Sequence, residues 1–66
     1  MRILTLTSRE REIIKLIAQG LPNNSIAERL SIAEKTVRNH LTIVYSKLQV
    51  SSRLELAIYA AQRHIQ

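Results

Sequence analysis

Residues 23–42 have the sequence NNSIAERLSIAEKTVRNHLT, in which two segments with helical spacing are separated by a three-residue turn. The first segment, about residues 24–30, has Asn23 as its expected N-cap. The turn is Ser31-Ile32-Ala33. The second segment, about residues 34–48, repeats apolar residues at helical spacing. These residues are Val37, Leu41, Val44 and Leu48.

Two helices joined by so short a turn must cross steeply over a small contact. Ala27 is the small residue midway along the first helix, and Ile26 and Leu30 flank it. Ile32 is an apolar residue in the turn, where it can fill the corner between the helices. The stretch therefore predicts a helix-turn-helix unit.

The segments on either side of this unit are also expected to be helices, about residues 8–19 and 53–63. Each begins with a capping box, Thr7 to Glu10 in the first and Ser52 to Glu55 in the second. Gly20 follows the first helix at a position where glycine commonly ends helices. The predicted fold class is all-α, with four helices in a single domain of residues 1–66.

Residues 53–63 carry two apolar stripes, although a short terminal helix needs only one stripe to dock. The first stripe is Leu54, Ala57, Ile58 and Ala61. The second is Leu56, Tyr59 and Ala60. One interpretation is a single wide buried face. The other, which we adopt as the prediction, is that Leu56, Tyr59 and Ala60 contact a second copy of the chain across a two-fold axis.

Composition narrows the choice of partners. The net charge is +5, the sequence pI is about 10.5, and there is no cysteine. A strongly basic chain indicates a polyanionic partner. No apolar run approaches the roughly 20 residues of a membrane span, and residues 1–10 lack the pattern of a secretory signal. We therefore expect a cytoplasmic protein without a membrane partner.

The polar side of residues 34–48 suggests what that partner is. Once the apolar residues are buried, Lys35, Arg38, Asn39 and Thr42 are left facing outward. An α-helix fits the major groove of DNA, where arginine pairs with guanine and asparagine with adenine. Lys35 and Thr36, in the first turn, lie where phosphates would pass.

Three segments resemble the LuxR/GerE-type helix-turn-helix domain of bacterial transcription regulators: LTSRERE, NNSIAERLSIAEKTVRNH and KLQVSSRLELA. The resemblance covers about residues 4–62 and implies a DNA-bound dimer with the third helix in the major groove. It implies base contacts by Arg38, Asn39 and Thr42. It implies phosphate contacts by Asn24, Lys35, Thr36 and Lys47. The fourth helix would supply the dimer contact, on DNA if not in solution.

Three positions depart from the family pattern: Ala33 replaces a capping serine, Gln49 a glycine and Ile43 a polar residue. The resemblance also allows RNA polymerase as a further partner and implies a place in the bacterial nucleoid. Members of the family often carry a receiver or ligand-binding domain ahead of this one, and the sequence leaves open whether such a domain precedes this chain.

Other functions remain as alternatives. We expect no enzyme, because the sequence lacks a nucleophile–base pair, a carboxylate dyad or a glycine-rich phosphate loop. We expect no cofactor and no metal site, since His40 and His64 are the two histidines and no carboxylate cluster accompanies them. Two alternative interpretations remain. One is the promoter-reading region of a sigma factor, and the other is a protein-interaction module on the same helix-turn-helix scaffold.

Overall fold

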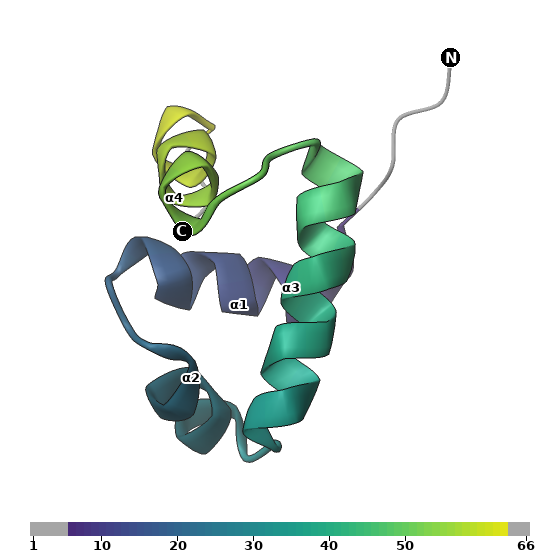
Figure 1. Ribbon diagram of the computed structural model, residues 1–66. Helices are drawn as coiled ribbons and strands as arrows, with labels where there is room; N and C mark the ends of the chain where they lie inside the picture. Colours follow the sequence, from purple (N-terminus) through teal and green to yellow (C-terminus); the bar gives the residue numbers. More distant parts are fainter. Residues whose placement is uncertain (1–5, 64–66) are drawn as a thin grey trace.

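The structure, a computed structural model, describes residues 6–63, and this part of the chain consists of four α-helices without a strand (Figure 1). The helices are α1 (Ser8–Ala18), α2 (Asn23–Leu30), α3 (Glu34–Leu48) and α4 (Arg53–Gln62). The predicted all-α class is confirmed, and the predicted bounds of α3 agree at both ends. His64 and both ends of the predicted 1–66 domain lie outside the described residues. None of the helices described is both long and apolar enough to cross a membrane.

α1 is the central helix and contacts each of the other three. In Figure 1 it runs across the middle of the molecule, with α2 below it, α4 above it and α3 standing across one end. α2 and α3 also pack against each other and form the helix-turn-helix unit. One side of α3 is therefore held by two helices, while its other side remains open.

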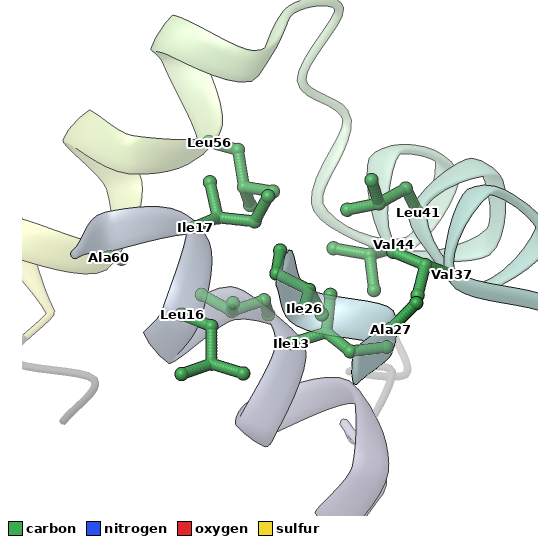
Figure 2. Packing of buried hydrophobic residues seen from close by; sticks show 11 residues of the cluster. Ile13, Leu16, Ile17, Ile26, Ala27, Val37, Leu41, Val44, Leu56 and Ala60 are labelled. Atoms are coloured by element: carbon green, nitrogen blue, oxygen red, sulfur yellow. The ribbon is translucent and has the colours of Figure 1, made fainter. Parts of the chain in front are cut away.

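All four helices contribute to one hydrophobic core (Figure 2). The buried members are Ile13, Ile14, Leu16, Ile17, Ile26, Ala27, Val37, Leu41, Val44, Leu56 and Ala60. Leu30, Ile32 and Leu48 pack against this cluster but are only partly buried. The helical spacing of the sequence thus identified the inward side of α1, α2 and α3.

The first capping box forms completely. The backbone N–H of Glu10 donates to Thr7 Oγ1 at 3.1 Å, and the backbone N–H of Thr7 donates to Glu10 Oε1 at 2.9 Å. At the other end of α1, Gly20 has a φ of 90°. The Leu21 N–H donates to the Leu16 carbonyl at 3.1 Å, which is the six-residue bond of a Schellman ending.

α2 and α3 end in the same way without glycine. Ser31 has a φ of 58° and Gln49 a φ of 56°, both in the left-handed region that disfavours residues with a Cβ. The Ile32 N–H donates to the Ala27 carbonyl at 2.9 Å, and the Val50 N–H donates to the Tyr45 carbonyl at 3.1 Å. The resemblance had marked Gln49 as replacing a glycine of the family, whereas Ser31 was not identified from the sequence as left-handed.

The prediction that Asn23 caps α2 is wrong. Pro22 occupies the cap position, and Asn23 is the first helical residue. The Asn23 side chain instead accepts a hydrogen bond from Arg53 Nη1 at 2.8 Å, while Arg53 Nη2 donates to the Leu21 carbonyl at 2.7 Å. A single guanidinium group thus connects the start of α4 both to the loop between α1 and α2 and to the first residue of α2.

The second capping box forms only in part. The Glu55 N–H donates to Ser52 Oγ at 3.1 Å, as predicted. The Glu55 carboxylate does not return to the cap residue: its Oε1 accepts from the backbone N–H of Ser51 at 2.8 Å and from the Ser51 hydroxyl at 3.2 Å.

The choice between the two stripes of α4 requires a larger correction. Leu56 and Ala60, predicted to face a partner, are 0% and 1% exposed and belong to the core. Figure 2 shows Leu56 packed next to Ile17 of α1. Tyr59 is half-buried, and the Arg63 guanidinium lies 4.3 Å from its ring centroid. The stripe left exposed is the other one, with Leu54 at 70% and Ile58 at 47% exposure.

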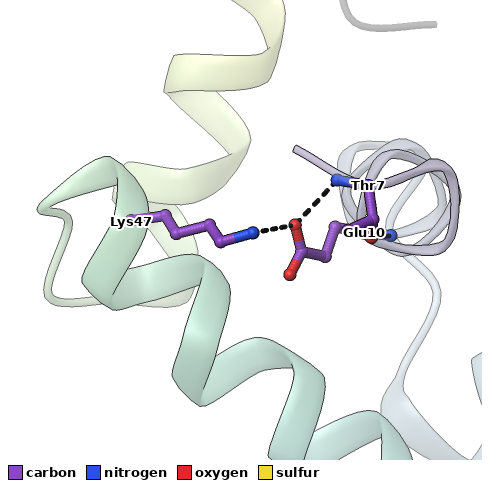
Figure 3. Close-up of polar contacts among 3 residues, drawn as sticks. All are labelled: Thr7, Glu10 and Lys47. Atoms are coloured by element: carbon purple, nitrogen blue, oxygen red, sulfur yellow. Dashed lines mark hydrogen bonds and ion pairs between the residues drawn. The ribbon is translucent and has the colours of Figure 1, made fainter. Parts of the chain in front are cut away.

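A partly buried ion pair joins α1 to α3 (Figure 3). Lys47 Nζ lies 2.8 Å from Glu10 Oε1, and the side chains of Lys47 and Glu10 are 21% and 5% exposed. Burial of the Glu10 carboxyl acts to raise its pKa, but the Lys47 ammonium and the Thr7 hydrogen bonds outweigh it. The pKa of Glu10 is therefore held below its ordinary value of 4.5.

We expect Lys47→Met, which keeps the aliphatic stem and removes the ammonium, to lower the free energy of unfolding by about 1–3 kcal/mol at about pH 7, because it leaves a buried carboxylate unpaired. Glu10 with a depressed pKa stabilises the fold at neutral pH, and that contribution is lost as the pH falls through the folded pKa, below 4.5. The stability difference between wild type and Lys47→Met should therefore shrink towards about pH 3.

Urea unfolding at both pH values measures this difference. Lys15→Met is the matched control, since Lys15 is exposed on α1. A Lys47→Met deficit of equal size at both pH values would mean that the charge of Glu10 does not contribute to the deficit.

Candidate nucleic-acid interface

The outward side of α3 is fixed by the residues that it buries. Val37, Leu41 and Val44 are 0%, 5% and 0% exposed, and they occupy the side of the helix that faces α1 and α2. The opposite side carries the exposed residues of the helix. These are Glu34, Lys35, Arg38, Asn39, Thr42, Ile43 and Ser46. The structure therefore gathers Lys35 and the three expected base-contacting residues, Arg38, Asn39 and Thr42, on one open surface.

α3 begins without a side-chain cap. Ala33 stands at the cap position, and no side-chain hydrogen bond is made there. Its carbonyl accepts from the backbone N–H groups of Thr36 and Val37 at 3.0 and 3.2 Å. The positive end of the α3 dipole is therefore exposed beside Lys35. Thr36, the next residue, is half-buried. Ala33, a departure from the family pattern, leaves this helix start without the hydroxyl that a serine would place there.

Arg38 is held only loosely. Its Nη1 atom lies 3.7 Å from Glu34 Oε2, and the two side chains are 58% and 51% exposed. Exposed ion pairs at i,i+4 contribute little because water screens them. Arg38 can therefore exchange Glu34 for a base edge at small cost.

The hydroxyl proton of Thr42 already takes part in a hydrogen bond within α3. Its Oγ1 donates to the Arg38 carbonyl at 3.1 Å. What Thr42 can still offer a partner is a hydroxyl lone pair and its methyl group. It therefore suits a hydrogen-bond donor or a thymine methyl group better than a base acceptor.

The Lys47 ammonium is directed towards α1 and does not project from this surface. Lys47 lies near the far end of α3, and its ammonium pairs with Glu10 of α1 (Figure 3). Asn24 is exposed, but in the first turn of α2, a different helix. Of the four expected phosphate contacts, Lys35 and Thr36 thus lie at the start of α3, whereas Asn24 and Lys47 lie apart from them.

Sequence reasoning missed two polar ties that support this surface. Glu10 was identified as half of a capping box, but not as the partner of Lys47, 37 residues away. Arg53 was not identified at all. The sequence does contain a sign of its role, because Arg53 is a cation at the first residue of a helix, where the helix dipole disfavours positive charge. A cation at such a position is expected to have a compensating hydrogen-bond acceptor. The acceptors are the Leu21 carbonyl, in the loop before α2, and the side chain of Asn23, the first residue of α2.

The geometry does not favour a metal centre. Among residues 6–63, no group of three or more His, Cys, Asp or Glu side chains could hold a metal ion. His40 is half-buried on α3, next to the apolar side of the helix. The residues that the structure brings together are suited to a polyanion.

Two curated relatives have the same sequence pattern. Over 60 residues, 91% of the chain, it is 52% identical to the nitrate/nitrite response regulator protein NarL of Escherichia coli (strain K12). Over 61 residues, 92% of the chain, it is 49% identical to the transcriptional regulatory protein LiaR of Bacillus subtilis (strain 168). These matches span 28% of NarL and 29% of LiaR, so the chain corresponds to less than a third of either relative.

Two solved structures have the same fold. The crystal structure of the response regulator ChrA, of a heme-sensing two-component system, matches with a TM-score of 0.89 and 38% identity. That match covers 100% of this chain and 33% of ChrA. The structure of the transcription factor GerE matches with a TM-score of 0.81 and 38% identity over 91% of this chain and 90% of GerE.

The family to which these relatives point also matches most of the chain. Residues 4–60 match the family described as bacterial regulatory proteins, luxR family. This range includes α1, α2, α3 and most of α4. The resemblance inferred from LTSRERE and the turn sequence is thereby confirmed. The chain belongs to the luxR family of bacterial regulatory proteins.

Proposed function

We propose that the chain binds double-stranded DNA sequence-specifically, with α3 in the major groove. The observation that carries this proposal is the outward side of α3, where Arg38, Asn39 and Thr42 are exposed while the apolar residues of the same helix are buried. Arginine and asparagine are the side chains that make two-point contacts to guanine and adenine edges. The net charge of +5 and the uncapped start of α3 beside Lys35 suit the flanking phosphates.

We further propose that the chain works as one part of a longer transcription regulator in the bacterial cytoplasm, on the DNA of the nucleoid. The support is its likeness to NarL and LiaR, of which it spans 28% and 29%. RNA polymerase is a partner that this role would allow.

Arg38→Ala should weaken binding to the preferred site by about 1–3 kcal/mol and relax preference at one base position. The preferred site comes from selection of bound duplexes from a random pool, repeated with the variant. Arg11→Ala is the matched control, because Arg11 is an exposed arginine on α1. The control should enrich the same site as wild type.

Lys35→Ala should behave differently from Arg38→Ala. It should weaken binding to all duplexes alike and lower the slope of log affinity against log salt by about 1, because one phosphate contact is lost. A selected site that is identical for wild type and Arg38→Ala would contradict the assignment of Arg38. Binding to duplex DNA without a salt slope would contradict the whole proposal and favour the protein-interaction module.

We also propose that two copies assemble on paired half-sites through α4. The exposed stripe of Leu54, Ile58 and Ala61 replaces the one inferred from the sequence, because Leu56 and Ala60 are in the core. Residues at i, i+4 and i+7 form one line on a helix, and a two-fold axis brings such a line against its own copy. Two α3 helices would then reach successive major grooves about 34 Å apart.

Ile58→Glu should abolish cooperative occupancy of two half-sites while leaving affinity for a single half-site close to that of wild type. The introduced charges would face each other at the two-fold contact. Gel shifts on duplexes with one and two half-sites measure both quantities. Ser8→Glu is the control for the change in net charge, since Ser8 is exposed at the start of α1. Undiminished cooperativity in Ile58→Glu would exclude this stripe as the dimer contact.

A further inference from the structure

Ile43 is an apolar residue in an otherwise polar surface. The exposed large hydrophobic residues of the described chain are Ile43 at 48%, Leu54 at 70% and Ile58 at 47%. Leu54 and Ile58 lie on α4 and share one stripe, whereas Ile43 lies on α3 without an exposed apolar neighbour on that helix. The core does not use Ile43, because Val44, the next residue, already fills the inward position at 0% exposure.

Helical geometry puts Ile43 beside the expected base-contacting residues. It follows Asn39 by one turn and is adjacent to Thr42, and all three side chains are exposed. One turn further along is Lys47, whose ammonium is drawn to Glu10. Along the line of Asn39, Ile43 and Lys47, Ile43 is thus the last exposed residue, and Ser46 is the exposed residue beside it.

The surroundings of Ile43 suit a small apolar group better than a protein partner. Asn39, Thr42 and Ser46 are polar, so Ile43 does not extend into a continuous apolar patch of the size that protein interfaces use. The apolar group that base edges present in the major groove is the C5-methyl of thymine. One helical turn advances about 5.4 Å, and base pairs are about 3.4 Å apart, so Ile43 reaches roughly one to two base pairs beyond Asn39.

We propose that Ile43 is a specificity-determining residue that contacts the C5-methyl group of a thymine in the major groove. This inference rests on the proposed function, since it requires α3 to lie in that groove. It predicts that the preferred site contains a thymine whose methyl group, and not its hydrogen-bonding edge, is recognised. The usual polar residue of the family at this position would not provide that contact.

Deoxyuridine tests the inference directly because it differs from thymine only by the missing methyl group. Each thymine of the selected site is replaced in turn, and affinities are measured for wild type and Ile43→Ala. At one thymine, wild type should lose about fourfold in affinity, the value of one buried methyl group. Ile43→Ala should bind the thymine duplex more weakly and show no further loss with deoxyuridine.

Two variants separate this inference from the proposed function. Arg38→Ala should keep the thymine-to-deoxyuridine ratio of wild type, and Ile43→Ala should keep the base preference assigned to Arg38. Alanine favours helix more than isoleucine does, and circular dichroism checks that α3 still forms in Ile43→Ala.

A deoxyuridine loss of equal size in wild type and Ile43→Ala would overturn the assignment of Ile43 and leave the proposed function intact. The absence of a methyl-sensitive thymine would do the same. If selection enriched no site at all, the proposed function would fail, and the role of Ile43 would fail with it.

Discussion

The orientation of α3 about its own axis decides which of its side chains reach the surface. Val37, Leu41 and Val44 are buried against α1 and α2, and they leave one orientation in which all three avoid water. Exposing any of them would cost roughly 1.5–3 kcal/mol. The same burial turns Arg38 and Asn39 outward. The core thus determines which side chains can meet a partner, although none of its own residues touches one.

Hydrogen bonds and an ion pair at the edges of the core fix the helices relative to one another. The Lys47–Glu10 pair joins the far end of α3 to the start of α1, and Glu10 is fixed in turn by the backbone of Thr7 (Figure 3). Arg53 joins α4 to the loop that precedes α2 and to the first residue of α2. In a chain of 66 residues with a thin core, such polar contacts restrict movements that apolar contacts alone would allow.

The local features of the fold were predictable because their causes are local. The capping box at Thr7, the glycine ending of α1 and the spacing of Val37, Leu41 and Val44 each depend on residues within one or two helical turns. Which stripe of α4 is buried depends on the residues of the other helices that pack against it. The periodicity of α4 alone does not identify those residues. Ala60 lies in the core with Leu56, whereas the larger Leu54 and Ile58 stay outside. The partners of Lys47 and Arg53 are 30 or more residues distant, so spacing gave no sign of them.

Intermolecular nuclear Overhauser effects would show whether the outward side of α3 touches base edges in the major groove. A carbon-13-labelled chain would be bound to its selected, unlabelled duplex. We expect contacts from the side chains of Arg38 and Thr42 to major-groove protons, namely thymine methyl groups, cytosine H5 and purine H8. Contacts confined to the minor-groove protons adenine H2 and sugar H1′, or arising from α4 while α3 shows none, would contradict it.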